Sequence, residues 1–372
     1  MIITRISAMK NLRIEVVDNF KDWSEISTQW NQLLEKSSSA TFFLTWEWLS
    51  SWAEHCLDDN RSLFVLALYE NERLAGAAPF YIQKGKAGPF QLREIRFLGT
   101  PEAGSDYLGV FTRKGREKEV ANTLYDFLIM GEAKNTWDQL VLEDIPSDSL
   151  FLQHFNSRIK ANGKYAAVGF SAYCPLLKLP GSEAGLYAMC SPGWRKKIKQ
   201  DNRVINREKN VVHFVSQVRV STSKLDEFFR LYETRTGYSG GRLKRVLESV
   251  IKKFQNEPPP VQLDLLSING RSVAGLVHLK YQDTLSMYLM AVDKGYNPKV
   301  SLGNFLVCQS IRNAIASGCS VYDFLKGDER YKFHWANRGI RTLHFSFWQK
   351  RPGAMYSAST GIIKNFGKLL IR

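Results

Sequence analysis

A strand–turn–strand pattern that occurs twice limits what this chain can fold into. Leu68–Gly76 has the pattern of a strand, a polar turn and a second strand that opens with Ala-Gly, and Leu266–Gly275 repeats this order about 200 residues later. The second copy contains Asn269-Gly270, a strong hairpin signal because both central positions of a type I′ turn need positive φ. Each hairpin is followed by an apolar helical pattern and a further strand-like run. Two copies of one element order predict a duplicated fold.

Hydrophobic periodicity predicts helices and strands intermixed along the chain. Runs rich in Val, Leu, Tyr and Phe are typical of strands, and they lie at Leu63–Tyr69, Leu74–Ile82, Gln139–Glu143, Gln262–Ile268, Val273–Tyr281, Leu285–Val292, Val321–Leu325 and Thr342–Trp348. Apolar residues at three- and four-residue intervals predict helices at Trp23–Glu35, Trp46–Cys56, Glu117–Met130, Lys224–Thr234, Leu243–Phe254 and Leu302–Ala316. The fold class is therefore α/β or α+β, with mixed sheets flanked by helices.

The length favours two domains. At roughly 100–200 residues per domain, a chain of 372 residues suggests two of them. We place the boundary near residue 180, just before a basic helix over 194–209 whose start is marked by Ser191-Pro192. The expected domains are 1–180 and 181–372.

The charge balance favours anionic partners. The chain has 51 Lys and Arg against 36 Asp and Glu, a formal net charge of +15. Such an excess suits phosphates, nucleic acid, an acidic polymer or a membrane face, and it also suits a basic, solvated surface. With 44% hydrophobic and 23% charged residues, the composition excludes wholesale disorder.

The cysteines argue against a disulfide framework. The chain has five of them, widely spaced and without a C-x-x-C motif, so neither disulfides nor a zinc site are expected and no metal is predicted. No apolar run approaches the ~18–20 residues that span a bilayer. Met1–Lys10 lacks the apolar core of a signal peptide. We expect a cytoplasmic protein, with peripheral contact at the inner face of the membrane as the alternative.

A candidate anion site lies where a predicted strand leads into a predicted helix. Ser301 is a plausible N-cap, and a loop of small residues at a helix N-terminus presents free N–H groups and the positive end of the helix dipole. The candidate phosphate-binding residues are Lys299, Val300, Ser301, Leu302, Gly303 and Asn304. The alternative is that Ser301 and Gly303 only cap and shape a turn.

A cluster of ionisable side chains follows the strand-like run that ends at Leu325. Gly327 marks a turn, and the residues with acid–base or charge-binding potential around it are Lys326, Asp328, Glu329, Tyr331 and Lys332. Carboxylates, a phenol and amines so close together at a strand end can supply general acids and bases. The same composition also fits a solvated helix start held by salt bridges.

Two further candidates are less specific. The loop Gly99–Gly109 contains the polar-aromatic pair Asp106 and Tyr107, which either lines a cleft or belongs to an ordinary surface turn. His278 lies in a strand-like run, where it faces either a site or a packed surface.

At these residues the chain resembles the CelD/BcsL-type acetyltransferases, tandem GNAT-like proteins related to the FemAB aminoacyltransferases. Tyr322–Lys332 resembles their "fdFl-G-D-E-x-YK" signature. Phe42–Leu49 resembles their N-terminal "pfqspeWl" helix, and Phe97–Tyr107 resembles their "flG…sDy" loop. Ser191–Arg207 resembles their basic inter-domain helix. The resemblance covers nearly the whole chain.

The resemblance implies two GNAT-like folds and acyl transfer, usually from acetyl-CoA and commonly in exopolysaccharide or cell-envelope synthesis. It places the CoA pyrophosphate at the backbone N–H groups of residues 300–304, although the usual Q/R-x-x-G-x-G/A loop is replaced here by residues 297–303. It assigns Tyr331 as the general acid and Asp328 or Glu329 as the base. Lys326 and Lys332 are then candidates for binding an anionic acceptor or the CoA phosphates. His278, Asp106 and Tyr107 complete the set of expected substrate contacts, the last two reaching the cleft from the first domain.

Two other classes of function stay open. One is a FemAB-like aminoacyltransferase that uses aminoacyl-tRNA, which the net charge and the basic helix would suit. The other is a non-catalytic glycan-binding protein with a GNAT-like fold.

The sequence also leads to two structural predictions. The first half has lost donor binding, because the phosphate-competent loop and the Tyr331 segment both lie after residue 290. Gly361–Arg372 forms a basic amphipathic helix that packs on the second domain, with membrane contact as the alternative.

Overall fold

The computed structural model describes residues 7–9, 12–215, 220–254, 259–297 and 299–369, and these form two units. Unit 1 consists of residues 1–171 and 341–372, and unit 2 of residues 172–340. The expected domains of 1–180 and 181–372 differ from these units chiefly at the C-terminus. The last segment returns to unit 1 because strand β16 (Arg338–Trp348) pairs with strand β9 (Gln139–Pro146).

Unit 2 is built on a mixed sheet with the strand order β11-β12-β13-β14-β15-β10. The strands are β11 (Val211–Val215), β12 (Val261–Ile268), β13 (Arg271–Tyr281), β14 (Thr284–Val292), β15 (Val321–Asp323) and the later part of β10 (Ala166–Lys178). Neighbouring strands from β11 to β14 are antiparallel, β14 and β15 are parallel, and β15 and β10 are antiparallel. The sheet therefore has one parallel pair, β14 and β15.

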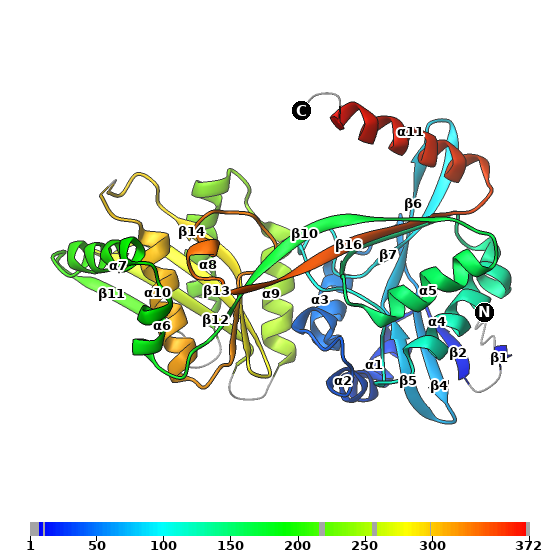
Figure 1. Ribbon diagram of the computed structural model, residues 1–372, viewed down its shortest axis with the longest axis horizontal. Coiled ribbons are helices and arrows are strands. Elements are labelled where there is room, and N and C mark those ends of the chain that lie inside the picture. The colour runs from blue at the N-terminus through cyan, green and yellow to red at the C-terminus, as the bar shows by residue number, and fades with distance from the viewer. Residues whose placement is uncertain (1–6, 10–11, 216–219, 255–258, 298, 370–372) are drawn as a thin grey trace. The chain divides into compact units, whose positions relative to one another are not determined.

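Helices cover both faces of this sheet (Figure 1). They are α6 (Glu183–Met189), α7 (Pro192–Ile205), α8 (Thr222–Thr236), α9 (Gly241–Lys253) and α10 (Leu302–Ala316). On one face Gly275 allows close contact with Phe228 of α8; on the other, Gly303 of α10 sits against Met290. The core between α6, α7, α10 and the sheet includes Leu186, Ile198, Leu276, Leu306 and Trp335.

Unit 1 contains two sheets. The first has the order β1 (Ser7–Met9), β2 (Leu12–Val17), β4 (Val65–Glu70), β5 (Arg73–Ala78) and β8 (Phe111–Thr112). The second has the order β16, β9, β7 (Phe90–Phe97), β6 (Phe80–Ala87) and β3 (Arg61–Leu63). The helices are α1 (Phe20–Glu25), α2 (Ser27–Glu35), α3 (Trp46–Cys56), α4 (Glu117–Tyr125), α5 (Leu150–Ala161) and α11 (Pro352–Leu369).

The two predicted hairpins are confirmed and share an irregularity. The β4–β5 turn has Asn71 at φ 54°, and the β12–β13 turn has Asn269 at φ 52° followed by Gly270 at φ 78°. The strand register shifts after Leu68 in the first hairpin and after Leu266 in the second. Each hairpin thus has an extra residue, a β-bulge, at the same point. Because β-bulges are conserved within families, this agreement is expected of two copies of one fold.

The C-terminal helix packs on unit 1. The expectation that it packs on the second domain is wrong for the part that the structure describes, because α11 lies against β6 and β7. Tyr356 lies 6.0 Å from Phe90, ring centre to ring centre, and Gly353 leaves no room for a side chain beside Gln91 O. Helix α11 runs through most of the predicted segment, of which residues 370–372 lie outside the described residues. Within the described residues, no helix is long and apolar enough to cross a membrane.

Candidate functional site

The parallel strands β14 and β15 separate after a short stretch. They pair at three positions, from Thr284 opposite Val321 to Ser286 opposite Asp323, and β15 then ends while β14 continues to Val292. The register between β13 and β14 also shifts near His278. The later part of β14 therefore has an edge without a paired strand in the sheet as described. Such an edge presents backbone N–H and C=O groups to a ligand.

Helix α10 begins soon after this edge, where the anion site is predicted. Ser301 is the N-cap, and the first helical hydrogen bond runs from Phe305 N to Ser301 O at 2.9 Å. The amides of residues 302–304 precede that bond, so they have no acceptor within the helix. Val300 and Leu302 are buried, whereas Lys299 is exposed. Gly303 packs closely on β14, since an added Cβ would lie 3.2 Å from Met290 Sδ and the thioether would have to shift.

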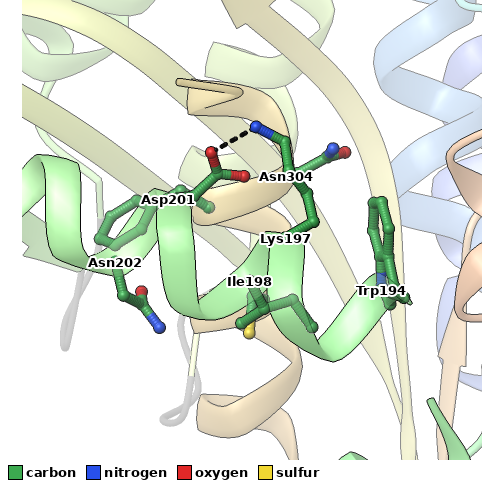
Figure 2. A pocket seen from close by; sticks show the side chains of 8 residues that line it. Trp194, Lys197, Ile198, Asp201, Asn202 and Asn304 are labelled. Atoms are coloured by element: carbon green, nitrogen blue, oxygen red, sulfur yellow. Dashed lines mark hydrogen bonds and ion pairs between the residues drawn. The ribbon is translucent and has the colours of Figure 1, made fainter. Parts of the chain in front are cut away.

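A buried carboxylate from α7 reaches the start of α10. Asp201 Oδ1 accepts a hydrogen bond from Ser301 N at 3.1 Å and pairs with Lys197 Nζ at 2.7 Å. Figure 2 shows this ion pair beside Asn304, in the small cleft between α7 and α10. The basic helix could be predicted from the sequence, but the role of Asp201 could not. Its hydrogen bond with Ser301 joins residues 100 positions apart.

Lys332 holds the turn after β15. Its side chain is buried, its Nζ pairs with Glu329 Oε2 at 2.9 Å, and it donates a hydrogen bond to Lys326 O at 2.8 Å. Gly327 adopts φ 135°, a conformation that L side chains rarely adopt. Asp328 and Glu329 are exposed, and Lys326 is half-buried. The sequence left this segment open between acid–base chemistry and a helix start held by salt bridges. For Lys332 and Glu329 the structure shows a salt bridge, so their charges are already paired.

Tyr331 is half-buried and packs against the core of unit 2. Burial raises the pKa of its phenol, the nearby Glu329 raises that pKa further, and Arg235 lowers it. Arg235 lies at the end of α8 and donates a hydrogen bond to Met290 O on β14. Arg235 therefore links α8 to β14, and its charge acts on Tyr331 in the segment after β15. The sequence carried no local signal for Arg235.

His278 is placed in the core. It is 1% exposed, and burial lowers the pKa of its imidazole to about 3. Its Nε2 lies 3.1 Å from Tyr322 Oη, which lies 2.7 Å from Ser310 Oγ, and Ser310 donates to Val307 O. Because Ser310 donates onward, Tyr322 must donate to Ser310 and His278 must donate to Tyr322. His278 therefore faces a packed surface; the alternative was that it faces a binding site.

Asp106 and Tyr107 belong to unit 1 and are both buried. Tyr107 has φ 53°, an uncommon conformation for a residue other than glycine. Their loop is held by Ser105, whose Oγ donates to Gly99 O at 2.8 Å and accepts from Trp48 Nε1 at 2.9 Å. The structure places this pair in a packed loop rather than in an exposed turn.

Unit 1 has its own helix in the position that α10 occupies in unit 2. This helix is α4, which follows β8. Glu117 and Glu119 lie in its first turn, so its own carboxylates lie at the positive end of its dipole. Arg116 at its N-cap pairs with Glu70 and Glu119. Among the residues that the structure describes, no group of three or more His, Cys, Asp or Glu side chains is arranged to hold a metal ion.

A family model described as an acetyltransferase (GNAT) domain matches residues 194–333. This stretch begins on α7, includes α10 and ends two residues after Tyr331, so the match covers the part of unit 2 described above. The protein is accordingly a transferase with a GNAT acyltransferase fold.

Similar solved structures extend the likeness to nearly the whole chain. One is FemX, at 11% identity and a TM-score of 0.58, covering 91% of this chain and 98% of that one. Another is a conserved protein of unknown function from Bacteroides thetaiotaomicron, at 12% identity and a TM-score of 0.53, covering 90% and 100%. A third is L-PGS from Bacillus licheniformis, at 11% identity and a TM-score of 0.50, covering 87% and 96%. At such identities these likenesses show the fold alone. No curated protein sequence matches the chain.

Proposed function

We propose that the protein transfers an acyl group, most simply acetyl from acetyl-CoA, to a hydroxyl or amine of a polysaccharide or cell-envelope precursor. The proposal follows the resemblance to the CelD/BcsL-type acetyltransferases. One observation carries it: the later part of β14, which has no paired strand on one edge in the described sheet, is followed after a short loop by the first-turn amides of α10, which have no acceptor within the helix. An extended amide-containing donor suits the strand edge, and its phosphates suit the helix N-terminus. Residues 299–304 form the proposed phosphate end of this site.

Tyr331 and a carboxylate supply the proposed proton transfers. The acceptor lone pair attacks the thioester carbon, the C–S bond breaks, and the departing thiolate takes the Tyr331 proton while a carboxylate takes the proton of the acceptor. A tyrosine phenol carries its proton at neutral pH, as a general acid requires, and burial raises the pKa of Tyr331 further. Glu329 is paired with Lys332, so the exposed Asp328 is the better base.

The proposed acceptor contacts are fewer than the sequence suggested. Lys326 is retained as a cation for an anionic acceptor. Asp106 and Tyr107 are left out because both are buried in a packed loop of unit 1. Lys332 is assigned to holding the turn, because its amine is buried and paired. His278 is left out because it lies within the core.

A second candidate is FemAB-like aminoacyl transfer from aminoacyl-tRNA. The observation that favours it is Asp201, a carboxylate beside the amides that would hold a CoA pyrophosphate. The net charge of +15 suits a nucleic-acid donor.

The two donors are separated by one set of incubations. The protein is mixed with candidate glycans and either acetyl-CoA, with release of free thiol recorded, or aminoacyl-tRNA, with transfer of labelled amino acid recorded. We expect acceptor-dependent thiol release. Amino-acid transfer without thiol release would establish the second candidate, and stabilisation by a glycan alone without either reaction would indicate a binding protein.

A further inference from the structure

Asp201 occupies an unusual position for a carboxylate in a phosphate-competent site. Its side chain is 2% exposed, although it lies on a helix whose other charged side chains are all basic. One oxygen accepts the hydrogen bond from the N-cap amide of α10, the amide of Ser301. A negative charge at this point satisfies the positive end of the α10 dipole, as a bound anion would.

The second oxygen of Asp201 is the informative atom. Among the described residues, Oδ2 is buried and has no hydrogen-bond partner. An unpaired carboxylate oxygen attracts N–H and O–H donors and repels the oxygens of a phosphate. Lys197 balances the charge but pairs with Oδ1, and its side chain is 34% exposed. The N-terminus of α10 therefore lies beside the Asp201 carboxylate, whose Oδ2 accepts no hydrogen bond among the described residues.

We propose that Asp201 is a specificity-determining residue that competes with phosphate for the N-terminus of α10. A phosphate-bearing ligand at the first-turn amides binds against this charge, so Asp201 weakens the affinity of the site for pyrophosphate without abolishing it. Removing the charge of Asp201 then converts the site into a stronger phosphate site. The inference rests on the proposed function only in treating the α10 N-terminus as the donor site.

The test measures binding of inorganic pyrophosphate by titration calorimetry at low ionic strength. Asp201→Asn keeps an oxygen that accepts from Ser301 N, so the helix cap is retained while the charge is lost. Asp226→Asn is the matched control, because it removes one carboxylate from α8 in the same unit, where Asp226 pairs with Lys244. We expect Asp201→Asn to bind pyrophosphate about tenfold more tightly than Asp226→Asn. Equal affinity of the two variants would overturn the proposal.

Lys197→Gln separates charge from loosening of α7. This variant keeps the carboxylate and removes its cation, so we expect pyrophosphate to bind more weakly than to the wild type. If loosening alone exposed the amides, Lys197→Gln and Asp201→Asn would both bind more tightly, which would contradict the proposal. Because these measurements use no acyl donor, their outcome is independent of whether thiol release from acetyl-CoA is found.

Discussion

Asp264 shows at the scale of one residue how burial couples this fold to pH. It lies on β12, is 3% exposed, and burial raises the pKa of its carboxyl to about 7. The folded state therefore keeps a proton that the unfolded chain, with a pKa near 3.9, releases. Stability due to this group should be full below about pH 4, decline up to about pH 7, and stay low above it. Asp264→Asn removes the ionisation and should stabilise the protein at pH 8 by about 1–3 kcal/mol, with little effect at pH 4.

Urea unfolding of both proteins at the two pH values checks this. Asp226→Asn serves as the control, since it removes a carboxylate whose side chain is 38% exposed. A stabilisation by Asp264→Asn that is the same at both pH values would show that Asp264 ionises normally in the folded protein.

At the scale of elements, the close packing of helix α8 on strand β13 contributes to stability. A Cβ on Gly275 of β13 would lie 2.7 Å from the Phe228 ring of α8, whereas a Cβ on Gly193 of α7 would meet nothing within 4 Å. Gly275→Ala should therefore destabilise by roughly 1–3 kcal/mol through overpacking. Gly193→Ala should be neutral or stabilising by up to about 1 kcal/mol because alanine favours the helix. Thermal unfolding measures both; equal effects of the two substitutions would contradict the α8–β13 contact.

One carboxylate helps to hold the residue that precedes α11. Asp138 accepts hydrogen bonds from Arg93 and Arg351; burial would raise its pKa, but the bonds from Arg93 and the charge of Arg351 hold it below its usual value. Asp138→Asn should cost about 1–3 kcal/mol and release the start of α11. Limited proteolysis should then cut near residue 351 faster than in the wild type. Faster cutting throughout unit 1, without preference for that site, would indicate global destabilisation instead.

At the scale of the whole molecule, local patterns predicted most elements but not the path between them. The Asn269-Gly270 turn and the apolar spacing of α10 are local signals, and both elements are confirmed. Strand β7 was not predicted because Arg93, Glu94 and Arg96 interrupt its apolar pattern. The return of β16 to unit 1 has no local signal, since it depends on pairing with β9, from Thr342 opposite Pro146 to Trp348 opposite Gln139.

The candidate site divides in the same way. The start of α10 and the segment of Tyr331 could be predicted because a helix start and a dense cluster of ionisable residues are visible in the sequence. Asp201 and Arg235 could not, because each acts on a residue that only the fold brings near: Ser301 in one case and Met290 in the other. The burial of His278 and Lys332 likewise follows from packing, and it removed two residues from the expected substrate contacts.

The central claim, acyl transfer in unit 2 with Tyr331 as the acid, is tested most directly by Tyr331→Phe. Turnover with acetyl-CoA and the melting temperature are measured on the same preparation. The ring contacts survive the substitution, so the protein should fold, and donor affinity should change little because the acid acts on charge that develops in the transition state. We predict a fall in turnover of roughly 10²–10⁴ with a melting temperature close to wild type. Wild-type turnover with a lowered melting temperature would contradict the claim, since the hydroxyl would then serve only the fold.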